Sequence, residues 1–98
     1  MEAAIGRYVW SKAGRDKNKL FIILDVLDED YVLIADGDLR PVDRPKKKKL
    51  KHLSVTGKTA EEISYAVTNR KRLTNADLMK AVQRYTDELA DSKSNGEG

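Results

Sequence analysis

The chain has 98 residues, of which 40% are hydrophobic and 36% are charged, and its formal net charge is +3. A chain of this length forms one small domain with a modest core. It has no cysteine and one histidine, which excludes disulfides and thiolate metal sites and argues against zinc, so we expect no metal or cofactor. No apolar run has the length of a membrane span or a secretory signal, which predicts a cytoplasmic protein with no membrane partner.

The first half of the chain is predicted to form β-strands. Short β-rich segments at residues 5–11, 20–28 and 31–35 are separated by turn-forming segments with glycine, asparagine or acidic residues. In segment 20–28, one face consists of Leu20, Ile22, Leu24 and Val26. The opposite face carries Phe21, Ile23, Asp25 and Leu27, and we expect it to be partly covered and partly wet.

The next two predicted segments are separated by Pro45 and the lysine run. Residues 39–42 are predicted to be an edge strand or a strand start, because Pro41 cannot donate to a neighbour. Residues 50–55 have an irregular apolar spacing, which indicates a bulge or a helical turn near His52. Five short strands in about fifty residues, joined by tight turns, predict a small β-barrel.

The pattern becomes helical after this point. Thr59 and Glu62 fit a capping box that begins one helix, and Thr74 and Asp77 fit a weaker one that begins a second. The second helix is predicted to reach about Leu89 on an apolar stripe formed by Leu78, Ala81, Val82, Tyr85 and Leu89. We therefore predict a barrel over residues 1–56, two short helices over 57–90 and a disordered tail over 91–98. The helices either close the barrel or offer a groove to a partner.

Basic charge is concentrated in two segments. Arg7 to Lys19 contains five Lys/Arg and one acid, and Arg40 to His52 contains seven Lys/Arg and one acid, which indicates a polyanionic partner. Within the second segment, Lys46–Lys49 form a lysine run. Such a run is commonly a solvated face or, after a proline, a nuclear address. On an extended strand, Lys46 and Lys48 would lie on one side, Lys47 and Lys49 on the other, and the strand could follow a phosphate backbone.

Residues 6–37 resemble a KOW motif, which forms part of an SH3-like barrel. They are also similar to ribosomal protein L-fourteen of the eukaryotic and archaeal type. That family's features fall here on Gly6–Arg7, Gly14, Lys19–Leu20, the sequence DVLD at residues 25–28 and Asp36–Gly37. Bacterial KOW-domain RNA-binding proteins share the segments SKAGRDK and PKKKKLKHL. Where the family has glycine before Lys19, this chain has Asn18, which also adopts left-handed geometry readily, so we expect the loop to keep its shape.

The resemblance implies an SH3-like barrel that binds structured RNA, most directly ribosomal RNA of the large subunit. Further partners would be ribosomal proteins or a translation or transcription factor. The RNA-binding residues predicted from both basic segments are Lys12, Arg15, Lys17, Lys19, Arg40, Arg44, Lys46, Lys47, Lys48, Lys49, Lys51 and His52. The alternative is a protein-interaction or transcription-elongation accessory module that uses the same barrel. Tyr8, Trp10 and Phe21 could stack on bases, although packing explains them better.

The sequence contains no set of residues for catalysis. No Ser-His-Asp or Cys-His set, phosphate-binding glycine loop or dinucleotide fingerprint occurs, so we expect the protein not to be an enzyme. The acidic turns at residues 28–30 and 36–38 lack the spacing of a calcium-binding loop, and turn formation accounts for them.

Overall fold

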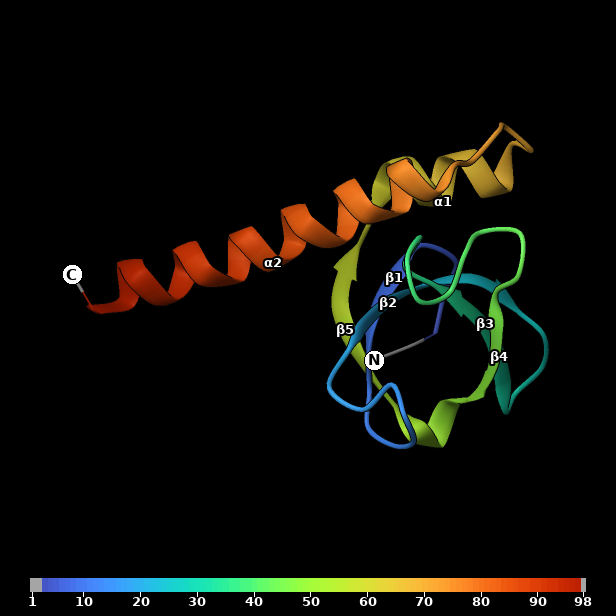
Figure 1. Ribbon diagram of the computed structural model, residues 1–98, viewed down its shortest axis with the longest axis horizontal. Helices are drawn as coiled ribbons and strands as arrows, with labels where there is room; N and C mark the ends of the chain where they lie inside the picture. The colour runs from blue at the N-terminus through green and yellow to red at the C-terminus, as the bar shows by residue number, and fades with distance from the viewer. Residues whose placement is uncertain (1–2, 98) are drawn as a thin grey trace.

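A computed structural model describes residues 3–97 as a curled antiparallel sheet followed by two helices (Figure 1). The spatial order of the five strands is β4-β3-β2-β1-β5. This confirms the predicted class, mainly β with C-terminal helices. The elements are β1 (Arg7–Ser11), β2 (Leu20–Val26), β3 (Tyr31–Ala35), β4 (Lys46–Lys49), the 3-10 turn η1 (Leu50–His52), β5 (Leu53–Thr59), α1 (Glu61–Thr68) and α2 (Asn75–Glu97).

The central strand β2 is buried on both faces. Phe21 and Ile23 point into the barrel, where they meet an interior cluster that also contains Val9, Val32, Ile34 and Leu53. Leu20, Ile22 and Leu24 point to the outer face and pack under the helices, against Ile63, Leu78 and Ala81 among others. The face predicted to be partly wet is therefore the barrel interior over Phe21 and Ile23, and it becomes exposed only from Asp25 onward.

Tyr8 of β1 fixes α2 to the outer face of the sheet. Its hydroxyl donates to the Ala81 carbonyl at 2.8 Å, and its ring stacks on that of Tyr85 with 4.4 Å between centroids. Burial raises the pKa of Tyr8, so the phenol stays a donor over the physiological range. An exposed bond from Arg84 to Glu62, 2.8 Å long, ties α2 to α1 and lowers the pKa of Glu62. The apolar stripe of α2 thus covers the sheet.

Two predictions about the strands are wrong. Residues 39–42 form a turn, in which the Arg40 carbonyl accepts from Asp36 and Gly37, and the lysine run provides the fourth strand instead. β5 extends to Thr59, three residues beyond the predicted end of the barrel. Ala60 is the N-cap of α1 and makes no side-chain capping bond, so the Thr59–Glu62 box does not form. The reason is that the sheet holds this segment: the Ala60 amide donates to the Gly6 carbonyl at 2.8 Å.

Of the two alternatives expected near His52, the helical turn is present as η1, and the capping box of α2 is present too. The Thr74 amide donates to Asp77 at 2.9 Å, and the Asp77 amide donates to the Thr74 hydroxyl at 3.1 Å. α2 continues to Glu97, past Leu89 and into the segment predicted to be a disordered tail, and Figure 1 shows this half extending away from the barrel. The segment beyond Leu89 is rich in polar residues. Gly98 lies outside the described residues.

The capping bonds lower the pKa of the Asp77 carboxyl. A carboxyl with a depressed folded-state pKa stabilises the fold above its unfolded value, near 4, and this contribution is lost as the pH falls through the folded value. We therefore expect Asp77→Asn to reduce the free energy of unfolding at pH 7, and expect this difference to shrink between pH 5 and pH 2. Urea unfolding at several pH values measures it. Asp91→Asn removes the same charge far from the cap, and a similar pH-dependent difference there would contradict this assignment.

Gly37 brings the turn after β3 against the start of α2. Its φ is +85°, and a Cβ atom at this position would overlap the carbonyl oxygen of Asn75. We expect Gly37→Ala to lower the free energy of unfolding by about 2 kcal/mol or more, because it adds backbone strain to this overlap.

Gly14→Ala is the matched control. Gly14 also has a positive φ, but its added Cβ would meet only the Lys48 ammonium at 3.5 Å. Urea unfolding of both variants distinguishes the steric overlap with Asn75 from the backbone strain that both variants share. Equal losses in the two would show that the Asn75 contact has no role.

Candidate nucleic-acid interface

The loop between β1 and β2, residues 12–19, is a compact and specifically folded turn. The amides of Lys17 and Lys19 donate to the carbonyls of Gly14 and Asp16, at 3.2 and 3.0 Å. Two positions adopt left-handed backbone, Gly14 with φ 79° and Asn18 with φ 70°. The prediction that asparagine can serve in place of glycine before Lys19 is therefore confirmed. This geometry turns the lysine and arginine side chains of the loop outward.

Asp16, the single acid of the loop, points inward. Its side chain is 8% exposed and accepts from the Arg40 guanidinium, with 3.1 Å to Nε and 2.8 Å to Nη2. Arg40 is also anchored through its backbone, because its amide donates to the Asp36 carboxylate at 2.8 Å. Arg40 thus ties the β1–β2 loop to the β3–β4 connection, and its charge is already compensated inside the protein.

Lys48 makes a second tie to the loop. It lies opposite Val32 of β3, whose side chain belongs to the barrel interior, so Lys48 points to the same side. Its ammonium donates to the Ala13 carbonyl at 3.1 Å. The residue is almost buried, and among residues 3–97 no carboxylate lies within 4.0 Å of its ammonium. The two basic segments therefore meet around an uncompensated positive charge.

The alternate lysines of β4 point outward. Lys47 and Lys49 flank the ring of Tyr31 on the neighbouring strand, with 4.5 and 5.8 Å from their ammonium groups to its centroid. Tyr31 is opposite Lys49 in the sheet register and is half-buried. Contact with an aromatic face orients an ammonium group without neutralising it. The predicted alternation along the lysine run is confirmed.

Most of the other predicted residues lie near this end of the barrel, while Arg44 and Lys46 lie in the β3–β4 connection and at the start of β4. The Lys12 amide donates to the His52 carbonyl at 2.8 Å, and Figure 1 shows the loop beside η1 at the end remote from the helices. Six side chains are exposed: Lys12, Arg15, Lys17, Lys19, Arg44 and Lys51. Lys46 and His52 are half-buried. None of these eight makes an ion pair within the described part of the chain.

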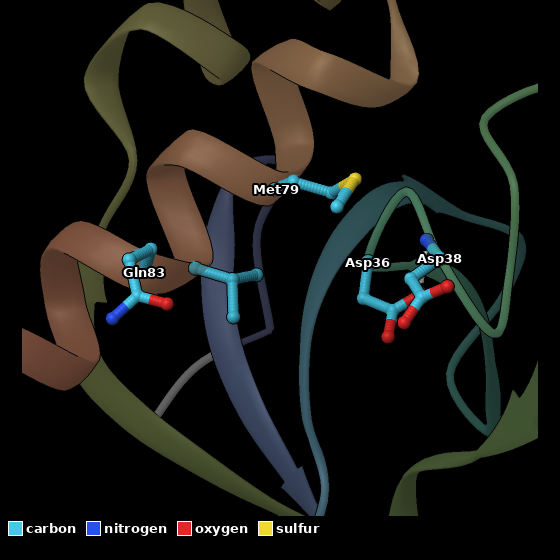
Figure 2. Close-up of a pocket in the computed structure, with 5 residues that line it drawn as sticks. Asp36, Asp38, Met79 and Gln83 are labelled. Atoms are coloured by element: carbon cyan, nitrogen blue, oxygen red, sulfur yellow. Dashed lines mark hydrogen bonds between the residues drawn. The ribbon is translucent and has the colours of Figure 1, made fainter.

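The acidic turns lie at two places, and Asp30 of the first lines a hollow together with Lys49 and Lys51. The Asp28–Asp30 turn closes the β2–β3 hairpin, and the Asp28 carboxylate accepts from the amides of Asp30 and Tyr31. Asp36 and Asp38 line a hollow of about 190 Å³ against Met79 and Gln83 of α2 (Figure 2). Within residues 3–97, no group of three or more acids, histidines or cysteines is placed to hold a metal ion. Turn formation accounts for these acids, as predicted.

Sequence reasoning placed Arg40 and Lys48 with the RNA-binding residues and missed the internal partners to which they bind. Asp16 gave one signal, since it is a single acid among cations and therefore a candidate for an internal ion pair. The Ala13 carbonyl gave none, because a backbone acceptor can be recognised only once the loop has its shape. The same holds for the contact of Lys47 and Lys49 with Tyr31.

The ion pair of Arg40 can be tested by substitution. Arg40→Gln would leave the Asp16 carboxylate buried without a cation, and we expect the free energy of unfolding to fall by about 2 kcal/mol. Asp16→Asn combined with Arg40→Gln should recover part of this loss, because it removes the unpaired charge.

Arg44→Gln is the control, since it removes an exposed arginine from the same segment. It should change stability by at most about 0.5 kcal/mol. If Arg40→Gln were as mild as this control, the tie between the two segments would contribute nothing to the fold.

Comparison with known proteins gives one informative relationship. No protein-family model matches the chain. Among curated proteins, it is similar to the Bacillus subtilis protein described as "Putative ribosome-binding protein YbzG", with 31% identity over 71 residues. The alignment covers 72% of this chain and 96% of that protein. Neither helix of residues 3–97 has the length and apolar character needed to cross a membrane.

Proposed function

This chain belongs to the family of YbzG, and from that premise we propose that it binds the ribosome by contacting phosphates of ribosomal RNA. The proposed contact surface, here called the basic end, consists of the exposed and half-buried cations of the loop and of β4 with its flanks: Lys12, Arg15, Lys17, Lys19, Arg44, Lys46, Lys47, Lys49 and Lys51, with His52 beside them. Arg40 and Lys48 hold this surface together from within.

The observation that carries this proposal is the bond from Lys48 to the Ala13 carbonyl. It fastens the strand with the lysine run to the basic loop, so cations far apart in the sequence share one end of the barrel. Among the described residues, no carboxylate lies within 4.0 Å of an exposed cation of this surface. A dense set of free cations on a rigid support is the arrangement that a phosphate backbone attracts.

The proposed mechanism is electrostatic. Lysine and arginine side chains neutralise phosphates and release condensed counterions, and Arg15 can grip one phosphate with two parallel bonds. Tyr8 and Phe21 are buried, and Tyr31 is half-buried beneath Lys47 and Lys49, so phosphate contact is favoured over base stacking at this end. We therefore propose recognition by shape and backbone, with slight base specificity, by a cytoplasmic non-enzyme that acts on large-subunit RNA. The KOW resemblance remains a prediction that fits this role.

Co-sedimentation with purified bacterial ribosomes over a range of salt concentrations tests the proposal. If about five phosphates are engaged, log K should fall with log salt at a slope near −4. Lys47→Gln combined with Lys49→Gln should weaken binding roughly tenfold or more and reduce the slope by about 1.5. These two lysines are suitable because both point outward and neither makes a hydrogen bond or ion pair in the described residues.

Lys58→Gln combined with Lys80→Gln is the matched control, because it removes the same charge from the helical side of the molecule. If both double variants lost the same affinity for ribosomes, net charge alone would explain the effect. Binding that is insensitive to salt and to both variants would refute the phosphate mechanism. It would favour the alternative, a protein contact made by the barrel.

A further inference from the structure

We propose that the turn between α1 and α2 is a second phosphate-binding site, formed by Arg70, Lys71 and Arg72 and here called the interhelical cluster. This inference rests on the proposed function, since both sites would contact the same RNA. It adds that the protein touches two separate RNA segments at once. The cluster lies outside the basic segments that the sequence pattern singled out.

The backbone of this turn holds an arginine where glycine is the usual residue. The Arg70 amide donates to the Val67 carbonyl at 3.2 Å, and the Lys71 amide donates to the Ala66 carbonyl at 2.8 Å. These two bonds define a Schellman motif, whose left-handed position is most often glycine. Arg70 occupies it with φ 54°. Glycine would adopt this backbone conformation with less strain, so the presence of arginine indicates a functional role for its side chain.

The three side chains are exposed and uncompensated. Arg70, Lys71 and Arg72 are all exposed, and none of them is within 4.0 Å of a carboxylate in the described residues. Arg84 of α2 and Lys58 of β5 differ in this respect, because they are paired with Glu62 and Glu88. Three adjacent free cations therefore project from one short turn.

The cluster is held in place from both sides. Val67 before it and Leu73 after it pack against the outer core, and the Thr74–Asp77 box fixes the start of the next helix. Tyr65, one helical turn before Asn69, is 61% exposed and offers a ring on which an unpaired base can stack. Cations on a fixed turn lose less conformational freedom on binding than cations on a mobile tail.

Most of the basic end lies across the barrel from the interhelical cluster. Arg44 is the exception, because its segment contacts the start of α2 through the bond from the Val42 amide to the Asn75 side chain. Figure 1 shows the α1–α2 turn above the barrel and the β1–β2 loop with η1 below it. One straight RNA backbone running along the basic end would not reach the cluster, so a folded RNA, or two neighbouring helices, is the partner that fits both.

Arg70→Gly provides the sharpest test, because stability and binding should change in opposite directions. Glycine relieves the left-handed strain, so the Tm should rise by roughly 2 to 5 °C. Loss of the charge should weaken binding to purified bacterial ribosomes about threefold, and Arg70→Lys should keep most of the affinity. A rise in Tm with unchanged affinity would overturn the proposal, because the arginine would then be a local defect without a use.

Arg70→Gly with Lys71→Gln and Arg72→Gln should weaken binding roughly tenfold and lower the salt slope by about 2. Added to Lys47→Gln with Lys49→Gln, its effect on log K should be additive, because the surfaces are distant. If wild type binds and the β4 variant is impaired while the triple variant matches Lys58→Gln with Lys80→Gln, this inference fails and the proposed function stands. If wild type does not sediment with ribosomes, both fail.

Discussion

The burial of β2 on both faces is the constraint on which the rest of the structure depends. A sheet of five short strands can curl around one face of this strand, and Phe21 and Ile23 fill the interior that results. Its other face, with Leu20, Ile22 and Leu24, would then be exposed to water. Because such apolar exposure is unfavourable, the chain needs a second layer, and the two helices provide it. The position of the helices therefore follows from a single strand.

This requirement also decides which part of the barrel is free. The helices occupy the outer face of β1 and β2, where Tyr8 locks α2 by a hydrogen bond and a stacked ring. The end with the β1–β2 loop and η1 remains uncovered (Figure 1). Most free cations of the two basic segments lie there, while the interhelical cluster lies on the far side of the covering layer. The charge asymmetry of the molecule is a consequence of how its core is closed.

The lysine run shows how one repetitive stretch acquires two roles. Alternation along β4 sends Lys48 inward, where its ammonium binds a loop carbonyl, and sends Lys47 and Lys49 outward over Tyr31. The hydrogen bond of Lys48 fixes the loop, whereas the charges of Lys47 and Lys49 remain available to a partner. Arg40 belongs with Lys48 in this respect, since Asp16 satisfies it.

The sequence by itself determined the first three strands, an irregularity near His52, the α2 cap and the left-handed asparagine, because these depend on local periodicity and turn chemistry. It misplaced the fourth strand and the first cap, where sheet pairing overrode local preference at residues 39–42 and Ala60. Only the tertiary structure decided which cations bind groups inside the protein and which are free. Asp16 and the Ala13 carbonyl become the partners of Arg40 and Lys48 through contacts between segments far apart in the chain. Charge can be counted from a sequence, but compensation of charge depends on distances in space.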